Sequence, residues 1–231
     1  MKKATFLCAL CLGVVGTAAA QNIQLHYDFG RPLYSRNLSD RPRVTATIEH
    51  FAPDKWGSTF FFVDLDLSST GMKAAYTEIS REISWWEMPV SAHIEYNGGM
   101  NSALSFNDAF LLGATYTYNA EDGIYGYTLT PMYKYIRHNR RPHNFQVTAT
   151  WYYHFCEGLY TFSGFADYWR EPSLFGTMIF MSEPQFWINL NRLRSVDDDF
   201  NLSVGTEFEL TANFIGSGWY VVPTLALKWQ F

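Results

Sequence analysis

Carboxylates and aromatic rings recur at every second position in several segments of the chain. Phe62, Asp64 and Asp66 follow this spacing, and Glu78 and Glu82 lie four residues apart a little further along. Because side chains alternate between the two faces of a β-strand, residues two or four apart share a face. Carboxylates on such a face accept hydrogen bonds from hydroxyl and amine groups, and a neighbouring ring offers a flat surface for stacking. The spacing therefore predicts a face suited to binding small polar molecules.

Along most of the predicted strands, the same residue types occupy every second position. We call such a set of alternate positions, which share one face of the strand, a parity. A buried unpaired charge costs several kcal/mol, so the core of a soluble protein would not hold so many carboxylates. We therefore expect this parity to line a water-filled interior. The predicted inward set is Gln24, His26 and Asp28; Phe62, Asp64 and Asp66; Tyr76, Glu78, Ser80 and Glu82; Ser91, His93 and Glu95; Thr130 and Lys134; Gln146, Thr148, Tyr152 and His154; Phe165, Asp167 and Trp169; Glu183, Gln185, Trp187 and Asn189; Glu207 and Glu209; and Lys228.

The opposite parity is apolar, most clearly in the last dozen residues. There Leu225, Leu227, Trp229 and Phe231 share a face, whereas Lys228 lies on the other. Alternation of apolar outward and polar inward residues is typical of strands in outer-membrane barrels. A final strand that stops on phenylalanine resembles the closing strand of such barrels.

Alternation and turn residues predict twelve strands, most of them ten or more residues long. Strands of soluble proteins usually span about 5–6 residues, whereas a tilted strand needs about 9–11 to cross a bilayer. The predicted fold class is all-β, a transmembrane antiparallel β-barrel of twelve strands. The expected strands are 23–29, 43–52, 58–67, 73–84, 89–97, 107–118, 124–136, 144–155, 158–169, 177–190, 201–212 and 219–231.

The connections between these strands alternate between long and short, as expected when both chain ends lie in the periplasm. The exception is the 191–200 connection, which is long at an end where the others are short.

Arg81 falls on the apolar parity, so it lies either at the rim or beside a bulge. Pro131 and Pro223 remove ladder donors in mid-strand and also suggest bulges. Twelve strands would enclose a narrow passage, between the filled interior of eight and the open channel of sixteen.

The first twenty residues carry Lys2 and Lys3, an apolar run and three alanines, the layout of a secretory signal peptide. We expect a signal peptide at 1–20 and an outer-membrane barrel at 21–231, which leaves Cys156 as the one cysteine of the mature chain.

No apolar stretch reaches the length of a membrane helix. Loss of both lysines takes the net charge from −5 to −7, so no overall basic surface for nucleic acid is expected. An aromatic content of 18% fits two interfacial girdles.

Four stretches carry a family resemblance: Asp54-Lys55-Trp56-Gly57 leading into residues 60–66, residues 76–82, residues 163–169, and the terminal strand. In these stretches the chain resembles the Tsx-like nucleoside-specific channels of Gram-negative outer membranes and, more closely, a related group of outer-membrane proteins of unknown function. The resemblance implies a monomeric twelve-stranded barrel with a narrow pore, without metal or cofactor. It also implies that lumen aromatics and polar groups bind the base and sugar of a nucleoside. The predicted stacking surfaces are Phe62, Phe165, Trp169 and Trp187, and the predicted polar partners are Asp64, Asp66, Glu78, Glu82, Asp167 and Glu183.

The sequence therefore predicts an integral outer-membrane channel for passive, selective diffusion of small polar solutes, most readily nucleosides. Excess carboxylates favour cations or neutral polyols over phosphorylated solutes. Apart from the solute, the expected partners are outer-membrane lipid and lipopolysaccharide, whose phosphates suit the basic 137–143 loop. One alternative is a structural or adhesive barrel with a filled lumen.

A lipid-modifying enzyme is a weaker alternative. Ser91 and His93 share a face, but two residues along a strand place them about 6–7 Å apart. They would also point inward rather than toward lipid. A cross-strand pair of His93 with Ser80 stays open, but no catalytic residue is predicted, and the scattered histidines show no metal-binding spacing.

Overall fold

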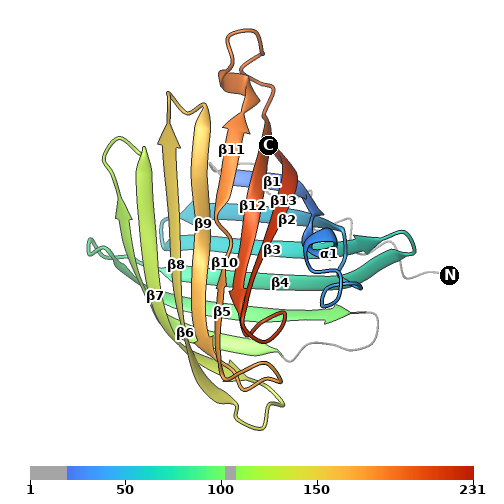
Figure 1. Cartoon of the computed structure of the whole chain (residues 1–231). Coiled ribbons are helices and arrows are strands. Elements are labelled where there is room, and N and C mark those ends of the chain that lie inside the picture. The colour runs from blue at the N-terminus through green and yellow to red at the C-terminus, as the bar shows by residue number, and fades with distance from the viewer. Residues whose placement is uncertain (1–19, 102–107) are drawn as a thin grey trace, which may run out of the picture.

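The strands of the computed structural model form one closed antiparallel barrel (Figure 1). The structure describes residues 20–101 and 108–231. The predicted signal peptide lies outside these residues except for Ala20, and so does most of the predicted 98–106 connection. Each strand pairs with its neighbour in sequence except β10 and β11, which both pair with β9 and β12. The barrel closes where β1 pairs with β13 through seven residue pairs from Asn22–Gln230 to Asp28–Thr224. The predicted fold class is confirmed.

The observed strands match the twelve predicted ones, with most boundaries differing by one to four residues. The one difference in number is that the predicted strand 177–190 is divided into β10 and β11. The strands are β1 (Ala20–Asp28), β2 (Val44–Asp54), β3 (Gly57–Ser68), β4 (Gly71–Ile83), β5 (Val90–Asn101), β6 (Ala109–Asn119), β7 (Tyr125–Ile136), β8 (His143–Phe155), β9 (Tyr160–Arg170), β10 (Met178–Ser182), β11 (Gln185–Asn189), β12 (Leu202–Ala212) and β13 (Trp219–Gln230).

The break between β10 and β11 falls at Glu183 and Pro184. Proline has no backbone N–H to give to the ladder, so regular pairing stops at this point. Both halves nevertheless pair with β9 in one register, because Met181 lies opposite Asp167 and Gln185 lies opposite Ser163. Together β10 and β11 therefore occupy a single strand position, and the barrel is twelve strands around.

The two faces of the wall agree with the predicted parity. On β13, Leu225 is 57% exposed on the outside, whereas its neighbour Ala226 is 1% exposed on the inside. Large apolar side chains are similarly exposed on the outer faces of the other strands, as Ile94 and Leu112 illustrate. An apolar belt of this kind around a closed barrel suits contact with lipid.

Three residues that resisted the parity analysis have simple explanations. Arg81 points outward at the rim, where its guanidinium bonds both carboxylate oxygens of Asp54, at 2.8 and 2.9 Å. Pro131 and Pro223 interrupt the ladders toward β6 and β12, but the register is the same on either side of each gap. The bulges predicted at these prolines are therefore not formed. A register shift occurs instead between Asp66 and Leu67.

The two ends of the barrel differ in their connections. We call the end that carries the 29–43 connection the loop end, and the opposite end, where β1 begins and β13 finishes, the turn end. The 29–43 connection contains the one-turn helix α1 (Gly30–Leu33), and its Leu38 packs with Tyr34 against Tyr220 and Val222 on the inner face of β13. Among the described residues, no helix has the length and apolar character needed to cross a membrane.

Candidate binding site in the barrel lumen

The inner surface of the barrel consists of walls with different degrees of packing. The inward side chains along the middle of β2 to β4 are half-buried; we call this surface the open wall. The inward side chains of β5 to β7 are nearly all buried; we call this surface the packed wall. On the open wall they include Thr45, Thr47, Glu49, Phe62, Asp64, Asp66, Tyr76, Glu78 and Glu82, and on the packed wall Ser91, His93, Glu95, Asn97, Leu111, Thr115, Thr130, Met132, Lys134 and Ile136.

Carboxylates from different sides of the lumen lie within electrostatic range of one another. Asp64 on the open wall is within electrostatic range of Glu183, which lies in the break between β10 and β11. Glu78 on the open wall interacts in the same way with Asp167 on β9. We call these four carboxylates the acidic constriction. Six of the ten predicted binding residues meet here, because Phe62 lies opposite Glu78 in the ladder and Phe165 accepts a backbone hydrogen bond from Glu183.

Hydroxyl groups, rather than cations, hold three carboxylates of the constriction. Thr47 donates to Asp64 at 2.5 Å, Thr148 donates to Asp167 at 2.5 Å, and Tyr76 donates to Glu78 at 2.6 Å. Within the described part of the chain, no Lys, Arg or His nitrogen lies within 4.0 Å of these oxygens. The constriction therefore presents to the lumen carboxylates that form no direct ion pair with the described residues.

Two of the four predicted stacking surfaces face this space. Phe62 and Phe165 are both half-buried, one on the open wall and one on β9. Tyr76 stands beside Phe62, with ring centroids 6.0 Å apart. An aromatic group in the lumen would thus meet ring surface and carboxylate at one level.

The two predicted tryptophans are covered by the protein itself. Trp187 is completely buried, with the ammonium of Lys228 4.2 Å above its ring. Its ring also lies against Gly205, where a Cβ atom would come within 2.5 Å of the indole, so only glycine leaves room. Trp187 therefore has no open face for a ligand.

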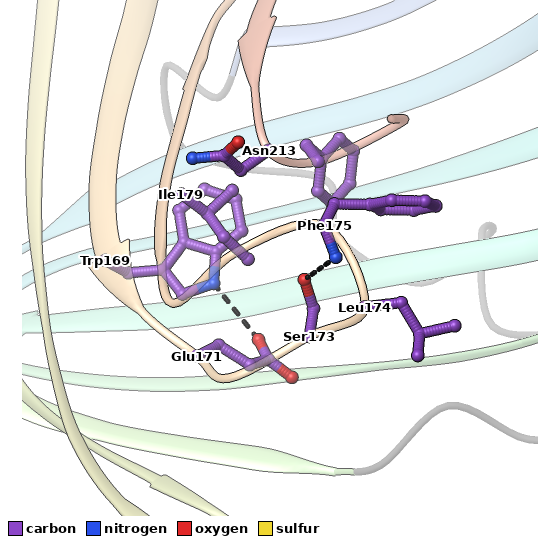
Figure 2. A pocket seen from close by; sticks show the side chains of 8 residues that line it. Trp169, Glu171, Ser173, Leu174, Phe175, Ile179 and Asn213 are labelled. Atoms are coloured by element: carbon purple, nitrogen blue, oxygen red, sulfur yellow. Dashed lines mark hydrogen bonds between the residues drawn. The ribbon is translucent and has the colours of Figure 1, made fainter. Parts of the chain in front are cut away.

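Trp169 is 6% exposed, because Lys134 lies 4.9 Å from its ring centroid and Phe214 packs edge-on at 5.7 Å. Above it, a pocket of about 300 Å³ opens at the loop end (Figure 2). Trp169 donates its indole N–H to Glu171 at 3.0 Å within this pocket. Trp169 thus lines a depression at the mouth, one inward position along β9 from Asp167 of the acidic constriction.

The remaining predicted residues, Asp66 and Glu82, lie on either side of the constriction. Asp66 accepts a hydrogen bond from Thr45 at 2.8 Å nearer the loop end. Glu82, nearer the turn end, accepts from Nδ1 of His93 at 2.6 Å, and also from Ser91. Nε2 of His93 donates to Glu95 at 3.1 Å.

This arrangement bears on the enzyme alternative. Both ring nitrogens of His93 point to carboxylates, so neither is free to accept a proton from a nucleophile. Ser91 also donates to Glu82 rather than to His93. The cluster lacks the serine-to-histidine hydrogen bond that an activated serine requires. The described residues also contain no group of three or more His, Cys, Asp or Glu side chains placed to hold a metal ion.

Arg41 is a lumen residue that the sequence analysis missed, because it belongs to a connection and not to a strand. Its Nε donates to Asp28 at 2.7 Å, and its other nitrogens reach Glu209 across the β1–β13–β12 seam. Burial opposes its charge, but Glu209 and Asp28 together raise the pKa of the guanidinium above its usual value. The signal available in the sequence was the presence of two inward carboxylates with no inward cation nearby.

The unexpectedly long 191–200 connection has a place at the turn end. It contains a short 3₁₀ helix, Leu190–Arg192, and forms a pocket of about 510 Å³ together with the turn after β8. Arg192, Arg194 and Cys156 are among the side chains that line it. This pocket is separate from the lumen residues described above.

The closed barrel with its carboxylate-rich inner face defines the class of protein: a porin-type antiparallel β-barrel. The chain belongs to the family described as a domain of unknown function (DUF5020), whose model matches residues 20–231.

Among solved structures, the NanC porin is similar over 91% of this chain and 100% of its own, with a TM-score of 0.57 and 7% identity. OccK5 of Pseudomonas aeruginosa matches over 90% of this chain and 62% of its own, with a TM-score of 0.43 and 11% identity. A BenF-like porin from Pseudomonas fluorescens Pf-5 matches over 90% and 58%, with a TM-score of 0.44 and 7% identity. No curated protein sequence matches significantly. At these identities the likeness concerns the fold alone. Of these three structures, the NanC porin is the one whose TM-score exceeds 0.5.

Proposed function

We propose that the protein is a passive, substrate-selective channel of the Gram-negative outer membrane for small polar solutes. The observation that carries this proposal is the acidic constriction, in which Asp64 and Glu78 of the open wall lie within electrostatic range of Glu183 and Asp167. Half-buried carboxylates at mid-height would meet any solute that passes. A closed barrel with an apolar belt supports the membrane location.

The charge of the lumen supports a cationic or neutral solute over a phosphorylated one. Among the described residues, eleven inward carboxylates face three inward side chains of lysine or arginine, Arg41, Lys134 and Lys228, and one histidine, His93, that contacts two of the carboxylates. Such a field raises the local concentration of cations and repels anions. The inward carboxylates are Asp28, Glu49, Asp64, Asp66, Glu78, Glu82, Glu95, Asp167, Glu183, Glu207 and Glu209.

Nucleosides are the leading candidates within this solute class. Stacking of a base on an aromatic side chain contributes about 1–3 kcal/mol, and Phe62 and Phe165 provide half-exposed rings beside carboxylates that accept hydrogen bonds from ribose hydroxyls. The protein would act as a monomer, with lipid around its belt. Lipopolysaccharide phosphates would meet the basic 137–143 loop at the loop end.

Single-channel recording of the refolded protein in a planar bilayer tests the proposal. We expect small conductance steps that adenosine and thymidine block and that glucose, a neutral sugar of similar polarity, leaves unchanged. Steps that respond equally to all three solutes would remove the nucleoside assignment and leave a general channel. A folded barrel without conductance would contradict the channel itself.

A barrel with a filled lumen is the second candidate, and specific observations favour it. The packed wall is buried along its length, Trp169 and Trp187 are covered by lysines, and Arg41 bridges Asp28 and Glu209 on the inner surface. Such a protein would serve as a structural or adhesive element of the envelope. The conductance measurement separates the two candidates directly.

A further inference from the structure

Two buried oxygen atoms on β5 lack hydrogen-bond partners. They are Oε1 of Glu95 and Oδ1 of Asn97, which lie on one face of the strand, two residues apart. Glu95 is 9% exposed and Asn97 is 5% exposed. Leaving a buried acceptor unpaired costs about 1–3 kcal/mol, and more for a charged group. Two adjacent unpaired acceptors therefore indicate a ligand or solvent that supplies donors.

The atoms belong to the junction where the packed wall meets the acidic constriction. Asn97 lies directly opposite Glu78 in the β4–β5 ladder. Glu95 interacts electrostatically with Glu78 on β4 and with Asp167 on β9. Glu78 and Glu95 are therefore diagonal neighbours on adjacent strands, and Asp167 lies within electrostatic range of both.

The protein's own cations leave this region incompletely neutralised. His93 is occupied by Glu82 and by the other oxygen of Glu95. Lys134 is within electrostatic range, but it donates to Gln146 at 2.8 Å and lies over the ring of Trp169. In the part of the chain that the structure describes, no lysine or arginine nitrogen comes within 4.0 Å of Glu78, Glu95 or Asp167.

We propose that Glu95, Asn97 and Glu78 form a subsite for the ammonium group of a small organic amine. A primary ammonium carries three N–H donors and one positive charge, which match two unpaired acceptors and a neighbouring carboxylate. Divalent metal ions fit less well, because they require several oxygen ligands at 2.0–2.6 Å in fixed geometry. The described residues contain no such cluster.

The surroundings also favour an aromatic amine. Phe62 and Tyr76 lie on the open wall next to Glu78, so the body of the solute would rest on their rings while its ammonium bonds to Glu95 and Asn97. This inference rests on the proposed channel function and narrows its substrate class. A nucleoside base with an exocyclic amine would use the same acceptors more weakly, because it carries no charge.

Tyramine and tyrosol make a suitable pair of probes, since they differ only in an ammonium group replaced by a hydroxyl. Isothermal titration of the refolded protein in detergent should show tyramine binding at least ten-fold more tightly than tyrosol. Glu95→Gln keeps the side-chain size and should reduce tyramine affinity at least ten-fold. Asn97→Ala should reduce it several-fold. Glu49→Gln, at another inward carboxylate that accepts from Gln24 at 3.0 Å, is the matched control for the loss of one inward charge and should reduce affinity much less than Glu95→Gln.

Equal affinity for the two probes would overturn the subsite, and so would an equal loss in Glu95→Gln and Glu49→Gln. Competition by sodium at concentrations equal to tyramine would replace the ammonium site with an inorganic cation site and also overturn it. Heat-dependent migration on gels confirms that each variant is folded. Conductance is measured separately on the same samples. Loss of conductance with retained tyramine binding would contradict the channel alone, and conductance without amine selectivity would contradict the subsite alone.

Discussion

The open wall and the packed wall have the same inward parity but opposite accessibility. On the packed wall, Leu111 is 1% exposed and packs with Met132 and Ile136, close to the His93 carboxylate cluster. On the open wall, Asp64 and Phe62 remain half-buried and Asp64 is held only by a threonine hydroxyl. The comparison teaches that an inward position in a barrel can serve either stability or solute contact. Apart from Glu95 and Asn97, at the junction of the two walls, substitutions on the two walls should therefore affect different measurements.

Leu111→Ala should have the largest effect on stability. Removal of a buried leucine side chain leaves a cavity among Ala109, Met132 and Ile136, and such changes cost about 3 kcal/mol. Reversible urea unfolding in lipid vesicles measures the loss, and channel selectivity should be unchanged. Leu112→Ala is the matched control, because Leu112 is 59% exposed on the outer face and lipid can fill the space. Equal losses in the two variants would show that the packed wall has no tight interior.

Arg41→Ala should have the next largest effect. Removing one partner of a buried ion pair costs about 3–5 kcal/mol, and the 21% exposure of the Arg41 side chain reduces the expected loss to about 2 kcal/mol. Asp28 and Glu209 would lose their shared cation. Arg137→Ala, whose 56% exposed side chain lies 3.5 Å from Asp108, should cost less than about 0.5 kcal/mol by the same unfolding assay. A loss at Arg41 no larger than at Arg137 would mean that the 29–43 connection is not anchored in the lumen.

The double substitution Asp64→Asn and Asp66→Asn should change the cation selectivity of the channel more than the stability of the fold. Both residues lie on the open wall, so the fold should lose less than about 1 kcal/mol, whereas two negative charges leave the lumen. The reversal potential in a potassium chloride gradient should move toward that of an unselective pore. Glu121→Gln with Asp122→Asn, at an exposed turn, is the control for net charge. An unchanged reversal potential would contradict a passage along the open wall.

Ionic strength should have the smallest effect. Mobile ions screen charges over about 10 Å at 0.1 M salt and about 3 Å at 1 M. The cation preference of the unmodified protein should therefore be weaker at 1 M than at 0.1 M potassium chloride, measured at a fixed concentration ratio. Half-exposed carboxylates of the open wall would respond in this way. A preference that does not change with salt would place the selective charges in a dry interior instead.

The strands and their faces could be predicted because both depend on a local rule. Each residue alternates between lipid and lumen, so a run such as residues 221–229 reveals its own orientation. The Glu183–Pro184 break escaped the analysis because it leaves the parity of the flanking residues unchanged. The absence of bulges at Pro131 and Pro223 has a similar cause, since each ladder tolerates a local gap without a shift in register.

The binding site was only partly predictable, because parity fixes a face but neither depth nor neighbours. The inward carboxylates Asp64 and Asp167 could be found, but their approach across the lumen depends on the curvature of the closed wall. The lysines that cover Trp169 and Trp187 come from other strands and could not be assigned to them. Asn97, which leaves an unpaired oxygen beside Glu95, gave no signal, because only its burial distinguishes it from other asparagines.

The β1–β13 seam joins segments about 200 residues apart in sequence, from Asn22–Gln230 to Asp28–Thr224. Contacts between such distant segments form slowly, because a long loop must close before they contribute any stability. Until that step, the outer strands expose unpaired N–H and C=O groups that can join other chains. The assembling chain is therefore an open sheet with two unpaired edge strands for most of its folding time. The yield of folded barrel should depend on how well a chaperone or membrane protects those edge strands until β1 and β13 pair.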